Sequence, residues 1–126
     1  MRFNLRKLSK PLAATALAAG TIAAAATVAA PAQAAGTYEG CPYGAVCVYP
    51  GAGWNGGHPT YVFYSYGPHK IYNQYGLHRV FNNQYGGATS WLCKGSDGTN
   101  CVWHNNQYSY TDYNLTPINS VKLVQG

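Results

Sequence analysis

Few side chains in this chain of 126 residues could carry acid–base or nucleophilic chemistry. Glycoside hydrolysis would need two carboxylates at a suitable separation, and residues 35–126 hold only three: Glu39, Asp97 and Asp112. No pair of histidines has the spacing of metal ligands on one element; they are His58, His69, His78 and His104. No G-x-S-x-G nucleophile motif is present. We therefore expect a protein that is not an enzyme and that holds no metal or other cofactor.

Cysteine is the other reactive residue type. Four cysteines are present, an even number: Cys41, Cys47, Cys93 and Cys101. They lack the paired C-x-x-C spacing that is typical of zinc sites. In an oxidising compartment such a set forms two disulfides by default, although the sequence alone allows three pairings.

The N-terminal residues predict that oxidising compartment. Four of the eight basic residues lie in the first ten positions: Arg2, Arg6, Lys7 and Lys10. An alanine-rich apolar run over residues 12–30 and a small-x-small site at residues 32–34 follow, which is the pattern of a secretory signal peptide rather than of a membrane anchor. We expect cleavage after Ala34, leaving residues 35–126 as one secreted, extracellular domain.

Removal of this leader also removes the apparent basicity of the chain. Residues 35–126 hold four basic and three acidic side chains, a net charge near +1. A basic groove for nucleic acid is therefore not expected, and neither is membrane attachment after cleavage.

The composition of residues 35–126 favours an all-β fold. All twelve tyrosines lie there, and glycine, proline and asparagine interrupt the chain about every ten residues. Short strands are predicted over residues 45–49, 60–64, 77–82, 89–93, 101–103, 107–110 and 120–124. Residues 67–76 have no clear strand pattern and could form a turn of helix. A weak internal repeat divides the domain into halves of roughly forty residues, as two Greek keys would.

Two motifs carry a family resemblance. Tyr49, Trp54 and Gly56 follow the aromatic-x₄-aromatic-x-Gly pattern of the folded hairpin in βγ-crystallin Greek keys, where glycine takes a positive φ. The preceding C-P-Y-G-A-V-C run, Cys41 to Cys47, together with this hairpin resembles the small secreted bacterial metalloproteinase inhibitors, a peptidase inhibitor family with a βγ-crystallin-like fold. The resemblance implies a Greek-key sandwich with two local disulfides, Cys41–Cys47 and Cys93–Cys101.

The resemblance also implies a function. The expected partner is a secreted peptidase, in particular a metalloendopeptidase, which a disulfide-closed loop would enter without a cofactor. The candidate inhibitory residues are Cys93, Lys94, Gly95, Ser96, Asp97, Gly98, Thr99, Asn100 and Cys101. Because this loop is small and polar, whereas many metalloproteases favour bulky apolar residues, a surface turn closed only for stability is the competing interpretation.

The chain departs from calcium-binding βγ-crystallins. Their acidic and Ser/Thr ligand positions are occupied here mostly by other side chains: Gln74, Tyr75, His78 and Arg79 in one half, and Leu115, Thr116, Asn119 and Ser120 in the other. Hard oxygen ligands are scarce, so we predict no tight calcium site.

An alternative function is a non-inhibitory secreted binding or antimicrobial protein of the same fold. Tyrosines cluster in the middle of the chain beside amides, and such surfaces contact cell-surface glycans; the rings are Tyr61, Tyr64, Tyr66, Tyr72, Tyr75 and Tyr85, and the amides Asn73, Asn82, Asn83 and Gln84. We expect about half of these rings in the core, as strand alternation would place them.

Overall fold

The computed structural model describes residues 36–126, and the predicted leader, residues 1–34, lies outside them. This part of the chain is all β apart from one 3₁₀ turn, η2 (Asn55–Gly57). The strands are β2 (Val46–Val48), β3 (Tyr61–Phe63), β4 (Gly67–Lys70), β5 (Leu77–Asn82), β6 (Thr89–Cys93), β7 (Cys101–Asn105), β8 (Ser109–Asn114) and β9 (Ser120–Val124).

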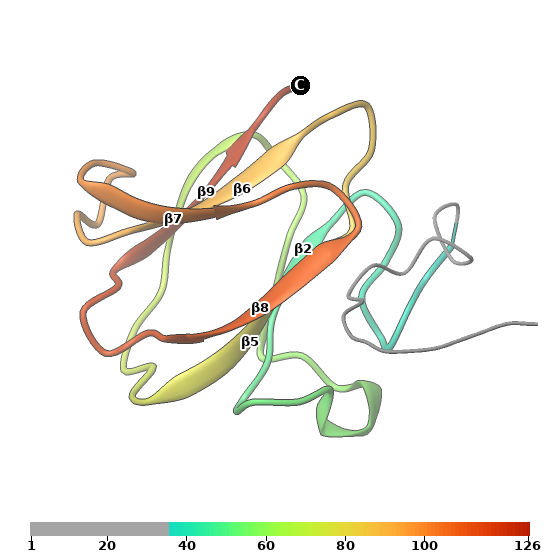
Figure 1. Ribbon diagram of the computed structural model, residues 1–126, viewed down its shortest axis with the longest axis horizontal. Helices are drawn as coiled ribbons and strands as arrows, with labels where there is room; N and C mark the ends of the chain where they lie inside the picture. The colour runs from blue at the N-terminus through green and yellow to red at the C-terminus, as the bar shows by residue number, and fades with distance from the viewer. Residues whose placement is uncertain (1–35) are drawn as a thin grey trace, which may run out of the picture.

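The strands form two antiparallel sheets (Figure 1). The first sheet has the order β3-β2-β5-β8, and the second has the order β4-β9-β6-β7. Each sheet takes three strands from one half of the domain and one strand from the other, since β8 joins the first sheet and β4 joins the second. The two halves suggested by the internal repeat are therefore interlocked and share one interior.

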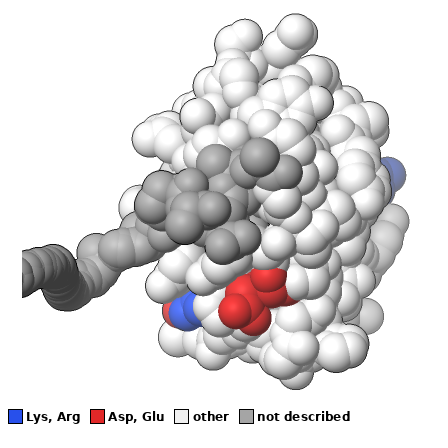
Figure 2. All heavy atoms as spheres, turned by 90° about the vertical axis from the view of Figure 1, so that its right-hand side faces the viewer, with Lys and Arg blue, Asp and Glu red and all other residues white. Residues whose placement is uncertain are grey.

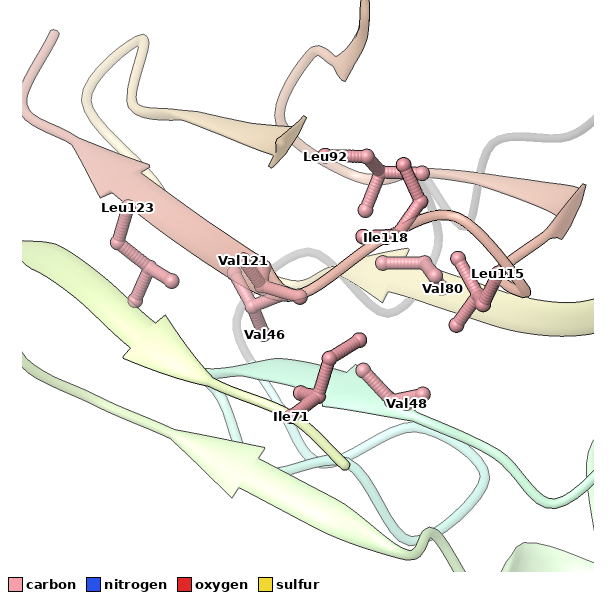
Figure 3. Packing of buried hydrophobic residues seen from close by; sticks show 9 residues of the cluster. All are labelled: Val46, Val48, Ile71, Val80, Leu92, Leu115, Ile118, Val121 and Leu123. Carbon is pink, nitrogen blue, oxygen red and sulfur yellow. The ribbon is translucent and has the colours of Figure 1, made fainter. Parts of the chain in front are cut away.

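Aliphatic side chains fill the space between the sheets (Figure 3). Alternation in β9 points Val121 and Leu123 inward, and Val46 and Val48 of β2 face them from the first sheet. The remaining members of this cluster are Ile71, Val80, Leu92, Leu115 and Ile118. Burial of these side chains, at roughly 1.5–3 kcal/mol each, is the main force that holds the sheets together.

Most of the predicted strands are confirmed, and three of them have the predicted bounds: β5, β6 and β9. The helical turn suggested for residues 67–76 is wrong, because Gly67–Lys70 forms strand β4. Pro68 is tolerated there because β4 is an edge strand, paired only with β9, so the missing N–H breaks no ladder on the other side.

Both predicted disulfides are present, Cys41–Cys47 and Cys93–Cys101. The first joins Cys41, which precedes β2, to Cys47 in the middle of β2, and the second joins the end of β6 to the start of β7. Among residues 36–126 no helix is long and apolar enough to cross a membrane.

Candidate functional site

The connections that follow the first strand of each half fold back over the outer face of a sheet. Residues 49–60, between β2 and β3, cover the first sheet, and we call them the first lid. Residues 94–100, between β6 and β7, cover the second sheet, and we call them the second lid. The second lid contains most of the loop predicted to be inhibitory.

The first lid is filled by aromatic rings. Trp54 lies edge-on to Tyr49, Phe81 and Tyr110, with ring centroids 5.3, 5.3 and 4.9 Å away. Gly56 has a φ of 63°, as the hairpin motif predicts. The lid therefore forms a second small core on the outside of the first sheet.

An ion pair closes this aromatic cluster. Arg79 donates from Nε and Nη2 to the two carboxylate oxygens of Asp112, at 2.8 and 2.9 Å. Its guanidinium also lies over the rings of Trp54 and Tyr110, 4.6 and 4.1 Å from their centroids. The hydrogen bonds to Asp112 raise the pKa of Arg79. The positive charge of Arg79 is thus paired with Asp112 and with two aromatic rings of the same domain.

The second lid is instead a short hairpin of small and polar residues. The Lys94 amide donates to the Asn100 carbonyl at 3.0 Å, and the Gly95 amide donates to the Thr99 carbonyl at 2.9 Å. At the tip, the Thr99 hydroxyl donates to Oδ1 of Asp97 at 2.6 Å, which lowers the pKa of that carboxyl. The loop has a defined shape even before its disulfide is considered.

Two polar side chains attach the second lid to the sheet below it. Ser120 Oγ accepts from the Gly98 amide at 3.1 Å and donates to the Gly95 carbonyl at 2.6 Å. Asn119 Nδ2 donates to the Lys94 carbonyl at 2.8 Å. Gly98 has a φ of 80°, and a Cβ there would lie only 2.9 Å from Pro68 Cβ, so this position requires glycine.

The outer side chains of the second lid remain free to contact a partner. Lys94, Ser96, Asp97, Thr99 and Asn100 are exposed, whereas Gly98 is buried against the sheet. The structure thus brings the predicted loop residues together into one rigid, outward-facing segment.

A groove of about 540 Å³ runs beside this lid. Trp91 and Lys122 of paired strands line its sheet side, and residues 98–101 line its lid side. The Trp91 ring stacks on His104, with centroids 4.5 Å apart, which fixes the ring. The second lid places no tryptophan on the outer face of the second sheet, whereas the first lid places Trp54 on the outer face of the first sheet.

Bulky apolar residues follow the second lid directly on β7. Val102 and Trp103 are 40% and 44% exposed, and β7 is an edge strand with one free side. Trp91, Val102 and Trp103 were not predicted from the sequence as surface residues of this site. The signal was present, because an inward Leu92 places Trp91 on the outer face by alternation.

Charged groups are unevenly placed. Lys94 and Asp97 belong to the second lid, and Lys70 and Lys122 lie near it. In residues 36–126 the ion pair of Arg79 with Asp112 is the one salt bridge. Figure 2 shows a face of the molecule on which charged atoms are few.

The histidines are used as hydrogen-bonding and packing groups. Ring nitrogens of His58 and His69 contact backbone carbonyls at 3.0 and 2.7 Å, and the buried His78 contacts two carbonyls, of Tyr49 and Tyr75, at 2.7 and 2.9 Å. Within residues 36–126 no three His, Cys, Asp or Glu side chains come together as a metal-binding group would.

The expectation for the tyrosines is wrong in one respect. Only Tyr61 of the six packs against the core. The other five are exposed by 52–69%: Tyr64, Tyr66, Tyr72, Tyr75 and Tyr85. The neighbouring amides Asn82, Asn83 and Gln84 are buried instead, because each turns inward to bond backbone groups.

Comparison with protein-family models, curated proteins and solved structures gives no significant match.

Proposed function

We propose that this chain is a secreted inhibitor of a peptidase, in particular a metalloendopeptidase, and that the disulfide-closed loop Cys93–Cys101 enters the target's cleft. The observation that carries the proposal is the double attachment of the second lid. The Cys93–Cys101 disulfide closes its base and Ser120 holds its middle, while its outer side chains stay exposed.

Such a loop suits inhibition for a thermodynamic reason. Binding through a flexible segment costs about 0.5–1.5 kcal/mol for each side chain that becomes ordered, and a loop ordered beforehand avoids much of that cost. A disulfide also keeps the two ends of the loop together if a peptidase cuts it. The loop itself is polar, so Val102 and Trp103 on the adjoining edge strand would supply the bulky apolar contacts.

The strand order supports a βγ-crystallin-like assignment, which we include in the proposal. Two Greek keys that exchange their third strands produce two sheets with three strands from one motif and one from the other. Strands β4 and β8 occupy those exchanged places. The folded hairpin at Trp54 and Gly56 agrees with the same family.

The test is a titration of purified, oxidised protein, residues 35–126, against a panel of secreted metallo- and serine endopeptidases. Residual activity on a peptide substrate is followed at increasing inhibitor. We expect a stoichiometric loss of activity for a metalloendopeptidase. Unchanged activity for every peptidase, with the protein intact after incubation, would refute the proposal.

A second candidate function is binding of a cell-surface glycan through exposed tyrosines. The observation that favours it is the exposure of five of the six clustered rings, which in a small domain leaves a large aromatic surface in contact with water. This activity needs no second lid, so it can be measured separately from inhibition.

A further inference from the structure

The end of the sandwich remote from the second lid gathers tyrosines from several segments. Strand pairing sets Val46, Phe63 and Asn82 side by side, and Ser109 opposite Asn82. Four tyrosines lie just beyond these strand ends, and a fifth, Tyr66, lies just before β4. We call these five residues the tyrosine basin: Tyr43, Tyr64, Tyr66, Tyr85 and Tyr108. The second lid begins at the opposite end of the second sheet, where Cys93 pairs with Ser120.

The basin contains a hollow of about 160 Å³. Its lining is formed by Gly44, Tyr64, Tyr66, Gln84 and Tyr85. Tyr64, Tyr66 and Tyr85 are 62%, 52% and 52% exposed, so a large part of each side chain is open to solvent. The volume is suited to one small ring rather than to a folded peptide segment.

Neighbouring contacts hold part of the basin rigid. Tyr43 stacks on Tyr85 with ring centroids 4.8 Å apart, and its hydroxyl lies 3.4 Å from that of Tyr108. That contact raises the pKa of Tyr108. Gly44, at φ 93°, passes under Tyr85, and a Cβ there would lie 3.4 Å from its ring. Tyr43, Tyr85 and Tyr108 are therefore held in place before any ligand arrives.

Gln84 adds one fixed hydrogen-bond acceptor. This side chain is buried, and its Nε2 donates to Asn82 Oδ1 at 3.0 Å and to the Thr89 carbonyl at 3.1 Å. Both amide hydrogens are thereby used, and Oε1 is left as the free polar atom of a residue that lines the hollow.

The chemistry of the lining selects the class of ligand. No Lys, Arg, Asp or Glu lines the hollow, so it offers a charged ligand no counter-charge. Aromatic faces accept the apolar C–H face of a sugar ring, while phenol hydroxyls and an amide oxygen bond its hydroxyls. Such sites combine aromatic walls with a few fixed polar groups.

We propose that the tyrosine basin binds a neutral polysaccharide by holding one pyranose ring against Tyr64 and Tyr66, with Gln84 Oε1 accepting a hydrogen bond from a sugar hydroxyl. This inference rests on the second candidate function and is independent of inhibition by the second lid. It would keep the protein at a polysaccharide surface while the opposite end of the domain stays free for a peptidase.

The test is affinity gel electrophoresis of the protein in gels that contain hydroxyethyl cellulose, dextran or galactomannan, with polygalacturonate as the charged comparison. The basin variant is Tyr64→Ala with Tyr66→Ala. The matched control is Tyr72→Ala with Tyr75→Ala, which removes two rings of similar exposure that do not line the hollow.

We expect wild type and control to be retarded by at least one neutral polysaccharide, and the basin variant to bind roughly tenfold or more weakly. Retardation of all three proteins to the same extent would leave glycan binding standing and overturn its assignment to the basin. No retardation of wild type in any neutral gel would overturn both. The basin variant should inhibit a peptidase as wild type does, so failure of the inhibitor proposal would be seen separately.

Discussion

The two lids occupy equivalent places on the two sheets and differ in what fills them. The first lid has twelve residues and inserts Trp54 among Tyr49, Phe81 and Tyr110, whereas the second lid has seven residues and inserts no ring. Beside the second lid a groove of about 540 Å³ is left, with Trp91 along its side. One lid completes a core, and the other leaves its polar tip and a groove open to solvent.

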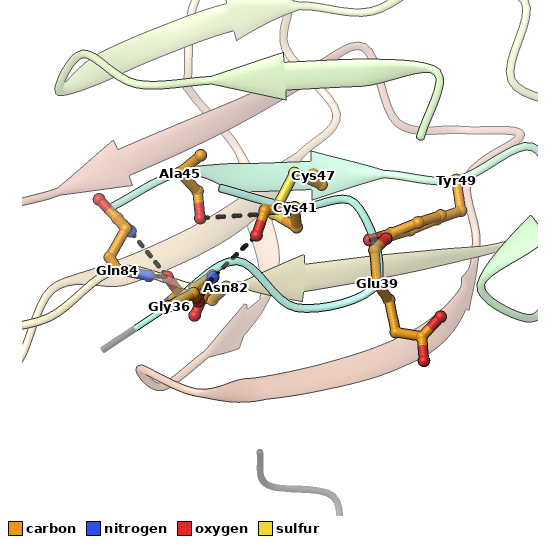
Figure 4. The surroundings of a disulfide bond; sticks show 9 residues. Gly36, Glu39, Cys41, Ala45, Cys47, Tyr49, Asn82 and Gln84 are labelled. Atoms are coloured by element: carbon orange, nitrogen blue, oxygen red, sulfur yellow. Dashed lines mark hydrogen bonds between the residues drawn. A yellow bond between two sulfur atoms is a disulfide. The ribbon is translucent and has the colours of Figure 1, made fainter. Parts of the chain in front are cut away.

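Their disulfides differ in the same way. Cys41 and Cys47 are fully buried in the aromatic cluster, which also contains Tyr49 (Figure 4). The Tyr49 hydroxyl donates to the Glu39 carbonyl at 2.8 Å. Cys93 is buried, but Cys101 is partly exposed at the base of the second lid. We infer that the first disulfide serves stability and that the second serves the shape of a binding loop.

Removal of each disulfide should give the largest separation between the lids. The two loops are similarly short, with sequence separations of 6 and 8, so loop closure contributes roughly 2 kcal/mol in each case. Cys41→Ala with Cys47→Ala also loses buried packing, and we expect a total loss of about 4 kcal/mol. Cys93→Ala with Cys101→Ala should lower the free energy of unfolding by about 2 kcal/mol and should abolish inhibition. Urea unfolding measures the loss of stability in each double variant. Equal losses of stability in the two variants would contradict the comparison.

The tryptophans should separate the lids next. Trp54→Ala removes the centre of the aromatic cluster and should cost about 3 kcal/mol, the low end of the range for a Trp→Ala substitution, because Trp54 is partly buried. Trp91→Ala should cost about 1 kcal/mol, because its ring packs mainly against His104 on the outer face. The measurement is urea unfolding, with the exposed Trp103→Ala as control. A larger cost at Trp91 than at Trp54 would contradict our view of the first lid.

Ser120→Ala should loosen the second lid without unfolding the domain. It removes the acceptor of the Gly98 amide and leaves that buried group unpaired, at a cost of about 1–2 kcal/mol. Hydrogen exchange at the Gly98 amide should accelerate, whereas the amides of β5 should keep their protection. Ser96→Ala, at an exposed position of the same lid, is the control. An unchanged Gly98 exchange rate would show that Ser120 does not hold the lid.

The smallest effect concerns pH and the first lid. Burial, with the nearby Glu39 charge, raises the pKa of Tyr49 above its ordinary value of 10. Below pH 10 both folded and unfolded chains keep this proton. As the pH rises further, the unfolded chain releases it first, so stability falls, by about 1 kcal/mol at pH 11.

Tyr49→Phe should remove the part of the fall in stability above pH 10 that is due to Tyr49. The measurement is the difference in unfolding free energy between wild type and variant at pH 8 and at pH 11. A difference that is the same at both pH values would show that Tyr49 does not titrate differently in the two states.

The sequence predicted the regular part of this fold well and the site in part. Strands β5, β6 and β9 were predicted with their bounds because β-branched and aromatic residues around Val80, Leu92 and Val121 are flanked by turn-forming residues. Strand β4 was missed because Gly67 and Pro68 are poor strand formers, and only its place at a sheet edge permits them.

The groove beside the second lid and the tyrosine basin depend on strand order and register, which cannot be read from the sequence. The second lid was predicted from its cysteines, but the groove at Trp91 requires knowing which strand lies beside β6. The tyrosine basin requires that Val46, Phe63 and Asn82 end at one level, which only the pairing of three strands decides. The assignment of half the tyrosines to the core failed because small aliphatic residues fill the interior, leaving little room for rings.

The most direct measurement is an inhibition titration of a second-lid variant beside wild type against a peptidase that wild type inhibits. The variant carries Lys94→Ser, Asp97→Ser, Thr99→Ser and Asn100→Gly, and it keeps both cysteines and Gly98. The control is Gly51→Ser with Ala52→Ser in the first lid, where neither position has a positive φ. We predict that the second-lid variant inhibits at least roughly 30-fold more weakly, the loss of one strong interface contact, while the control matches wild type. Equal inhibition by all three proteins would contradict the account.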